Sequence, residues 1–140
     1  MSASSAKHEG LKVILDSNAL FVPIEFKIDI FMEVERLLNR RVDLVLLSPV
    51  KRELELLATK DSPTIRRQAT FALKFAEKCK YIPIREDKKE QTDDIIINVA
   101  KAWNSPVFTN DRLLRRRLRD IRVPVIYVRQ KLRLEIDGLI

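Results

Sequence analysis

The sequence predicts an α/β fold of three layers, in which helices cover both faces of a central parallel sheet of four to five strands. The prediction comes from the alternation of short apolar segments of strand length with longer segments of helical spacing. Right-handed connections then place the carboxyl ends of all the strands at one edge of the sheet. The 140 residues are enough for one domain with a sizeable core.

The first part of the chain contains two predicted strands separated by a helix. The first strand is predicted at residues 12–15, where an apolar run from Val13 ends abruptly in polar residues, as expected of a buried strand that reaches the sheet edge. Apolar residues recur at helical spacing over residues 28–39, and Asp29 or Lys27 begins that helix. Residues 42–47 are apolar except for Asp43 and too short for a helix, so we expect a second buried strand there.

Two adjacent helices and an edge strand are predicted next. A serine followed by a proline, which is typical of a helix start with the serine as its cap, occurs at residues 48–49 and 62–63. Residues 81–84 are a short apolar stretch of strand type. Pro83 favours an edge position for this strand, because proline cannot donate a backbone hydrogen bond.

The last part of the chain repeats the alternation of helix and strand. Residues 92–94 suit the cap and first turn of a helix that continues through Trp103. Residues 107–109 are the next predicted strand and end in polar residues, as residues 12–15 do. A basic helix over residues 112–119 and a last strand over residues 124–128 complete the prediction.

Charge and cysteine content favour a cytoplasmic protein with an anionic partner. The formal charge of +7 and the isoelectric point of about 9.8 favour association with nucleic acid. Cys79 has no second cysteine for an internal disulfide, and no apolar run reaches the ~18 residues of a membrane span. We expect residues 1–10, with the sole histidine His8, to be flexible and residues 11–140 to form the single domain.

Four acidic residues fall where the predicted topology brings them together. Asp16 and Asp111 follow predicted strands, while Asp93 and Glu53 lie in the early turns of predicted helices. Carboxylate oxygens are the ligands that Mg²⁺ or Mn²⁺ prefers, and such ions activate water for phosphodiester hydrolysis. Plainer interpretations exist, because Asp93 and the adjacent Asp94 also complement a helix dipole and Glu53 also suits a solvated helix surface.

Four segments carry these acids, namely residues 15–20 (LDSNAL), 50–57 (VKRELELL), 93–96 (DDII) and 109–112 (TNDR). Together, and in this order, they resemble the four motifs of the PIN-domain nucleases. The resemblance extends over about residues 11–128 and implies a PIN-like fold. Residues 114–118 and 123–127 are most similar to the branch that includes the eukaryotic small-subunit rRNA-processing endonuclease and its archaeal relatives, and less similar to the VapC-type toxins.

The resemblance implies a metal-dependent endoribonuclease that uses Mg²⁺ or Mn²⁺. The implied catalytic and metal-binding set is Asp16, Glu53, Asp93 and Asp111. A shift by one residue would put Asp94 in the place of Asp93. Asn18 and Thr109 are implied to support the carboxylates from the side, or else they make only local turn hydrogen bonds. Ser17 stands where the family usually has threonine, and Leu113 stands where this branch usually has a further aspartate.

The same resemblance implies RNA as the substrate, with pre-rRNA and a ribosomal precursor particle as the expected partners in ribosome biogenesis. A basic surface would hold the RNA backbone with little discrimination between sequences. The plainer interpretation of that surface is a solvated helix face. Its predicted members are Arg112, Arg115, Arg116, Arg117 and Arg119 of the basic helix, followed by Arg129, Lys131 and Arg133.

Other functions are compatible with the sequence. A non-catalytic module could dock on RNA or a ribosomal protein, although the retention of four mutually repelling acids disfavours this. A toxin-type ribonuclease of a toxin–antitoxin pair is a further alternative. A phosphatase of the haloacid dehalogenase type would need a second aspartate where Asn18 stands. A homodimer contact, or packing against the chain's own sheet, would employ the apolar tail residues Leu132, Leu134, Ile136, Leu139 and Ile140.

Overall fold

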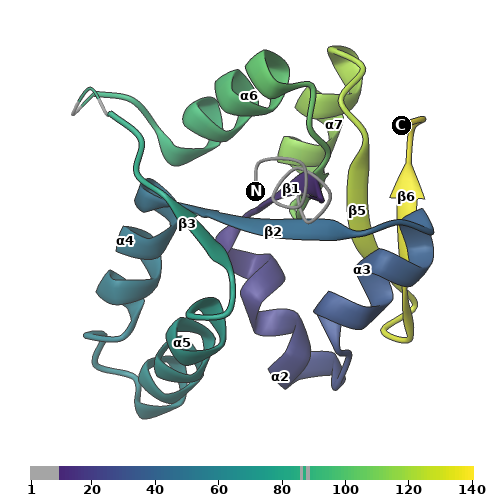
Figure 1. The fold of residues 1–140 in the computed structure, drawn as a ribbon. Coiled ribbons are helices and arrows are strands. Elements are labelled where there is room, and N and C mark those ends of the chain that lie inside the picture. Colours follow the sequence, from purple (N-terminus) through teal and green to yellow (C-terminus); the bar gives the residue numbers. More distant parts are fainter. Residues whose placement is uncertain (1–9, 86, 88) are drawn as a thin grey trace, which may run out of the picture.

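Six strands form one sheet. The computed structural model of the chain describes residues 10–85, 87 and 89–140, so the segment predicted to be flexible, with His8, lies outside the described residues except for Gly10. The strand order is β3-β2-β1-β4-β5-β6 (Figure 1). The strands are β1 (Leu11–Leu15), β2 (Val42–Leu47), β3 (Lys80–Ile82), β4 (Val107–Phe108), β5 (Val125–Arg129) and β6 (Arg133–Asp137).

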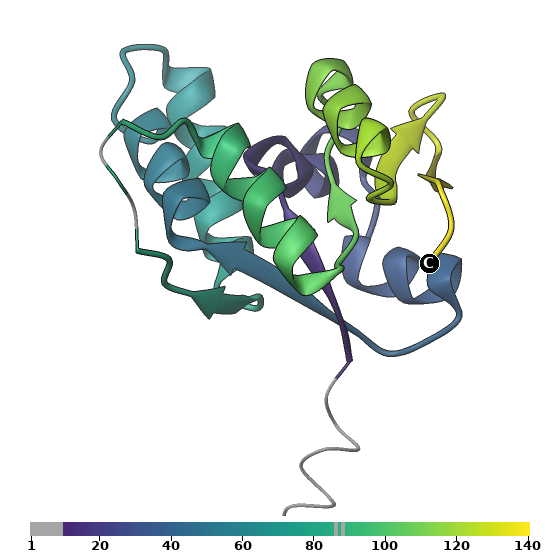
Figure 2. The same cartoon turned by 90° about the horizontal axis from the view of Figure 1, so that it is seen from above.

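The helices divide between the two faces of the sheet. The chain steps from β1 to β2 to β3 in one direction and from β4 to β5 in the other, so α6 and α7 lie on the face opposite the earlier helices (Figures 1 and 2). The helical elements are η1 (Ser17–Phe21), α2 (Val22–Phe26), α3 (Ile30–Leu38), α4 (Ser48–Leu57), α5 (Pro63–Ala76), α6 (Thr92–Trp103) and α7 (Arg112–Asp120).

The direction of the chain connections reverses between β1 and β4. These two strands are neighbours and pair in parallel, with Leu15 opposite Phe108. The helical segments that follow them depart to opposite faces of the sheet (Figures 1 and 2). In open α/β sheets this reversal point is where ligands bind. The fold therefore brings the polar residues after β1 and β4 to the position expected for a functional site.

The predicted α/β/α architecture is confirmed, with one correction to the sheet. The strand predicted at residues 124–128 is β5, but it is not the last strand, because β6 follows it and pairs antiparallel with it. The sheet thus has six strands rather than four to five, and it is not parallel throughout. Gln130 and Lys131 make the turn between the two strands, both with positive φ. The alternation of polar and apolar residues over β6 was the available signal, since it is typical of a half-buried edge strand.

The core is built on the strands that flank the reversal point. β1 and β4 contribute side chains that have no exposed surface, and burial of each large apolar side chain stabilises the fold by about 1.5–3 kcal/mol. This packing anchors the strand ends from which the polar residues project. The fully buried residues of these two strands are Val13, Ile14, Leu15, Val107 and Phe108.

The two predicted serine caps have different outcomes. Ser62 caps α5 as predicted, because its side chain accepts a hydrogen bond from the Ile65 N–H at 3.4 Å. The prediction for Ser48 is wrong: α4 includes Ser48 and has Leu47 as its cap, with no side-chain bond. Ser48 Oγ instead accepts from the Ile84 N–H at 2.9 Å, which attaches the segment after the edge strand β3 to the start of α4.

The cysteine and the C-terminal tail are partly packed. Burial raises the pKa of the Cys79 thiol to about 12, so this residue stays protonated and weakly nucleophilic at neutral pH. Leu134 is buried and Ile136 packs on the core, while exposed tail residues include Leu132, Leu139 and Ile140. In the part of the chain that the structure describes, the helices are too short or too polar to span a membrane.

Candidate functional site

Asp16 is a buried carboxylate at the end of β1, and only 5% of the residue is exposed. Its Oδ1 accepts a hydrogen bond from the Ser17 backbone N–H at 2.8 Å. Its Oδ2 accepts from Thr109 Oγ1 at 2.7 Å and from Asn18 Nδ2 at 3.0 Å. Burial raises the pKa of Asp16 and the charge of Asp111 raises it further, although the hydrogen bonds oppose this shift.

Thr109 and Asn18 join the ends of β1 and β4. Thr109 is fully buried, and its Oγ1 both donates to Asp16 and accepts from the Asp111 N–H at 3.1 Å. Asn18 Oδ1 accepts from the Asn110 N–H at 2.9 Å. A buried group with several short hydrogen bonds has little freedom to rotate. The structure therefore places the two predicted supporting residues against Asp16, where they determine the position of its carboxylate.

Asn110 belongs to this network, although the sequence alone did not predict a role for it. Its backbone N–H donates to Asn18, and its side-chain Oδ1 accepts from the Val128 N–H at 2.8 Å. Asn110 thus connects the ends of β1, β4 and β5. Its place in a polar run directly after a strand was the available signal, but the partner on β5 could not be read from the chain.

Asp111 forms the N-terminal cap of α7. Its Oδ1 accepts from the backbone N–H groups of Leu113 at 2.9 Å and Leu114 at 3.2 Å. A carboxylate at this position satisfies two helix-end donors and complements the positive end of the helix dipole. The cap fixes the Asp111 side chain beside the carboxyl end of β4.

Glu53 on α4 and Asp93 on α6 approach the same region from the two sides. Burial raises the pKa of Glu53, and the charges of Asp16 and Asp93 raise it further. Burial also raises the pKa of Asp93, with further increases from Asp16 and Asp111, while Arg117 lowers it. Each of the four acids therefore lies within electrostatic range of at least two of the others.

Asp94 has a different environment from Asp93. Its Oδ1 lies 2.6 Å from Arg117 Nη2, in an ion pair that links α6 to α7. Adjacent residues on a helix point in directions about 100° apart, so only one of the two can face the end of β1. The structure places Asp93 on the side of Asp16 and Asp111, and it places Asp94 against Arg117.

Electrostatic proximity does not amount to a closed set of metal ligands. Among the residues that the structure describes, no three histidine, cysteine or acidic side chains are placed so that they could hold one metal ion. In this arrangement both oxygens of Asp16 and the Oδ1 of Asp111 accept hydrogen bonds from the protein.

The predicted RNA-binding arginines of α7 point in different directions. Arg115 donates from Nε to Asp137 Oδ2 at 3.2 Å, and its guanidinium lies 3.6 Å from the centre of the Tyr127 ring. Arg119 also pairs with Asp137, at 3.2 Å. Arg117 faces α6 instead, in its pair with Asp94. Within the described residues, no ion pair involves the other two members of the predicted set, Arg112 and Arg116.

Comparison with known proteins decides the family. Residues 13–131 match the sequence pattern of a family described as a PIN like domain. The chain belongs to the PIN-domain family. This agrees with the resemblance of the four acidic segments and with the sheet order that surrounds them, so the resemblance and the expected fold are confirmed.

Relatives of this PIN domain include both a sequence match and structural matches. Ribonuclease VapC4 of Methanocaldococcus jannaschii is 36% identical over 132 residues, which cover 92% of this chain and 98% of that protein. The structure of the PIN domain endonuclease Utp24 superimposes with a TM-score of 0.78 and 26% identity, covering 92% of each chain. A domain of a functionally unknown protein from Methanocaldococcus jannaschii has a TM-score of 0.64 at 20% identity and shares the fold, covering 93% of this chain and 99% of that chain.

Proposed function

We propose that this PIN domain is a metal-dependent endoribonuclease. The observation that supports it best is the cluster of four acids around the reversal point between β1 and β4, beside a helix rich in arginine. One relative is named a ribonuclease and another an endonuclease, which favours internal cleavage of RNA over other phosphodiester chemistry. We assign the catalytic and metal-binding roles to Asp16, Glu53, Asp93 and Asp111.

The chemistry of these four side chains fits a hard divalent cation. All of them present carboxylate oxygens, which Mg²⁺ and Mn²⁺ prefer over nitrogen or sulfur ligands. Burial and mutual repulsion raise the pKa values of three of them, and a bound cation would relieve both effects. When bound there, the ion supplies charge stabilisation at the scissile phosphate and a lowered pKa of an attacking water.

The protein's own contribution is placement. Thr109 and Asn18 hold the Asp16 carboxylate in one orientation, so the side chain does not have to change rotamer to bind a metal ion. The helix cap holds Asp111 in a similar way. The arginines of α7 attract the anionic backbone of RNA to the same edge of the sheet. Cys79 supplies no nucleophile, because burial raises the pKa of its thiol and keeps it protonated at neutral pH.

Replacing Asp93 or Asp94 with asparagine tests the proposal with two adjacent variants of equal charge. Asp93→Asn is expected to lower cleavage of a labelled structured RNA in Mn²⁺ or Mg²⁺ by at least about tenfold, because it removes a proposed metal ligand. Asp94→Asn is expected to change the rate by less than about threefold, because an exposed ion pair contributes only about 0–1 kcal/mol.

EDTA is the control for the metal, and it should abolish cleavage by the wild-type protein and by Asp94→Asn alike. Cleavage that persists in EDTA would contradict the metal dependence. Equal activity of the two variants would contradict the assignment of Asp93. RNA binding by the wild-type protein without cleavage in any metal would favour the alternative of a non-catalytic binding module.

Two classes of RNA substrate have support. The similarity of residues 114–118 and 123–127 to the rRNA-processing branch favours pre-rRNA, within a ribosomal precursor particle. The 36% identity to ribonuclease VapC4 gives equal support to a toxin-type ribonuclease. We place either activity in the cytoplasm, since Cys79 is a free thiol. A homodimer is compatible with the exposed apolar tail.

Expression in a bacterial host separates the two substrate classes. A toxin-type ribonuclease is expected to arrest growth, and the inactive Asp16→Asn variant is expected not to do so. A processing enzyme is expected to leave growth unaffected and to cut a purified precursor rRNA transcript at one position. General degradation of the transcript together with growth arrest would contradict the processing role.

A further inference from the structure

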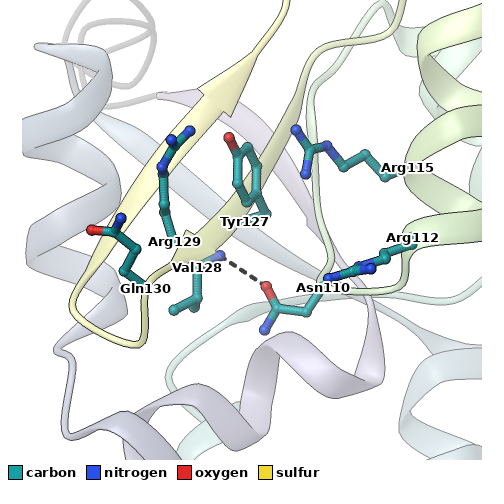
Figure 3. A pocket seen from close by; sticks show the side chains of 7 residues that line it. All are labelled: Asn110, Arg112, Arg115, Tyr127, Val128, Arg129 and Gln130. Atoms are coloured by element: carbon teal, nitrogen blue, oxygen red, sulfur yellow. Dashed lines mark hydrogen bonds between the residues drawn. The ribbon is translucent and has the colours of Figure 1, made fainter.

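A pocket lies beside the acidic cluster, between α7 and β5. Its volume is about 400 Å³, and Figure 3 shows side chains of α7 reaching toward those of β5 across it. Asn110 forms one wall, and the same residue donates to Asn18 next to Asp16. The pocket is therefore connected to the proposed catalytic site by a continuous hydrogen-bonded path. Its other lining residues include Arg112, Arg115, Tyr127, Arg129 and Gln130.

The lining of this pocket is strongly cationic. It contains three arginines, and no carboxylate belongs to the lining among the described residues. Arg115 lies over the face of Tyr127 and pairs with Asp137, while Arg129 pairs with Glu135 at 3.4 Å. The hydrogen bond to Tyr127 and the charge of Glu135 raise the pKa of Arg129. Arg112 forms no ion pair within the described part of the chain. An anion that enters the pocket would thus meet guanidinium groups whose charge is only partly compensated.

A second pocket continues the first along α7. Its volume is about 450 Å³, and it shares Arg112 and Arg115 with the first while adding Arg116, Arg119 and Asp137. Asp137 binds both Arg115 and Arg119, so a residue of β6 orients two of the arginines. With a rise of 1.5 Å per residue, Arg112 and Arg119 are about 10 Å apart along the helix axis. The cationic lining is therefore long enough to contact more than one phosphate.

We infer that these two pockets form a binding track for the backbone phosphates of the RNA strand next to the cleavage site. The α7–β5 pocket takes the phosphate nearest the acidic cluster, with Arg112 and Arg129 as its main ligands. This inference rests on the proposed function and adds a path for the substrate. It also separates the arginines of α7 by role, because Arg117 lies on the opposite side, paired with Asp94.

The test compares Arg112→Gln/Arg129→Gln with Arg66→Gln/Arg67→Gln, a control that removes the same charge from α5. Binding of a labelled single-stranded 12-nucleotide RNA is measured in EDTA over a range of salt concentrations. The pocket variant is expected to bind at least about tenfold more weakly. Its salt slope is expected to be smaller by about 0.7, because the contact with one phosphate is lost. The control is expected to bind as the wild type does.

RNA with single neutral methylphosphonate linkages gives a second measurement that does not depend on how well a variant folds. One linkage position should weaken binding to the wild type and the control, and it should have no further effect on the pocket variant. The same penalty in all three proteins, or an unchanged salt slope, would overturn the inference. Competition by poly-aspartate as effective as that by RNA of equal charge would also overturn it, in favour of an acidic protein partner.

The binding measurement is separable from the proposed nuclease activity. If the wild-type protein never cleaves RNA but its RNA binding depends on Arg112 and Arg129, the proposed nuclease activity is refuted and the proposed binding track is supported. If the wild-type protein cleaves RNA in Mn²⁺ and the pocket variant binds RNA as tightly as the wild type, the nuclease activity is supported and the binding track is refuted.

Discussion

Asp16→Asn is expected to lower metal-dependent RNA cleavage by at least about a hundredfold. Loss of a residue that only supports a metal ligand typically lowers activity by about 10–100-fold, and Asp16 is proposed to be a ligand itself. It is the most buried of the four acids and accepts three hydrogen bonds that hold its carboxylate in place. The measurement is single-turnover cleavage of a labelled RNA in Mn²⁺, with wild type and variant side by side.

The same substitution is expected to stabilise the metal-free protein. Burial and the charge of Asp111 raise the pKa of Asp16, so the ionisation of Asp16 opposes folding. The stability that goes with the protonated form is present below the unfolded pKa of about 3.9 and is lost as pH rises through the higher folded value. An asparagine in place of Asp16 would remove that loss, and a gain of about 1 kcal/mol would raise the melting temperature by about 4 °C.

Thermal melts in EDTA and in Mn²⁺ provide the control. Added Mn²⁺ should raise the melting temperature of the wild type, because a ligand that binds only the folded state stabilises it, and it should have much less effect on the variant. Between neutral pH and about pH 4 the stability difference between the two proteins should shrink, as Asp16 becomes protonated. Equal cleavage by the two proteins would refute the catalytic role given to Asp16, and a destabilised variant would refute the expected relief of burial and charge repulsion.

Thr109→Val is expected to reduce both stability and activity. The valine has nearly the same shape but cannot donate to Asp16 Oδ2 or accept from the Asp111 N–H. Because Thr109 is fully buried, water cannot replace these bonds, and the expected loss is about 1–3 kcal/mol. Cleavage is expected to fall by about 10–100-fold, since the orientation of a proposed metal ligand is lost. Denaturant unfolding and cleavage assays measure the two effects.

Thr109→Ser is the matched variant, because it keeps the hydroxyl and loses only the buried methyl group. It should lose about 1 kcal/mol of stability or less and should retain most of the activity. Equal losses of activity in the two variants would mean that packing at Thr109 matters more than its hydrogen bonds. An active and stable Thr109→Val would exclude the supporting role altogether.

The positions of the strand ends could be predicted from the sequence because burial leaves a local pattern. A mostly apolar run of four to six residues between polar ones is too short for a helix and indicates a buried strand. The strand β2 accordingly lies at residues 42–47, as predicted. The acids after β1 and β4 could be placed at one sheet edge by the handedness of parallel connections alone. The cap predicted at Ser48 was wrong, because its side chain instead bonds to Ile84, and a partner 36 residues away leaves no local pattern.

Taken by itself, the sequence determined the class of fold, the order of its elements apart from η1, α2 and β6, and a set of candidate acids that the topology brings to one edge of the sheet. Each depends on local periodicity and on the general geometry of parallel sheets. Only the tertiary structure decided that Asp93 rather than Asp94 faces Asp16, and that the arginines of α7 divide between β5, β6 and α6. These outcomes depend on the rotation of each helix about its axis and on partners distant in sequence, which local patterns do not encode.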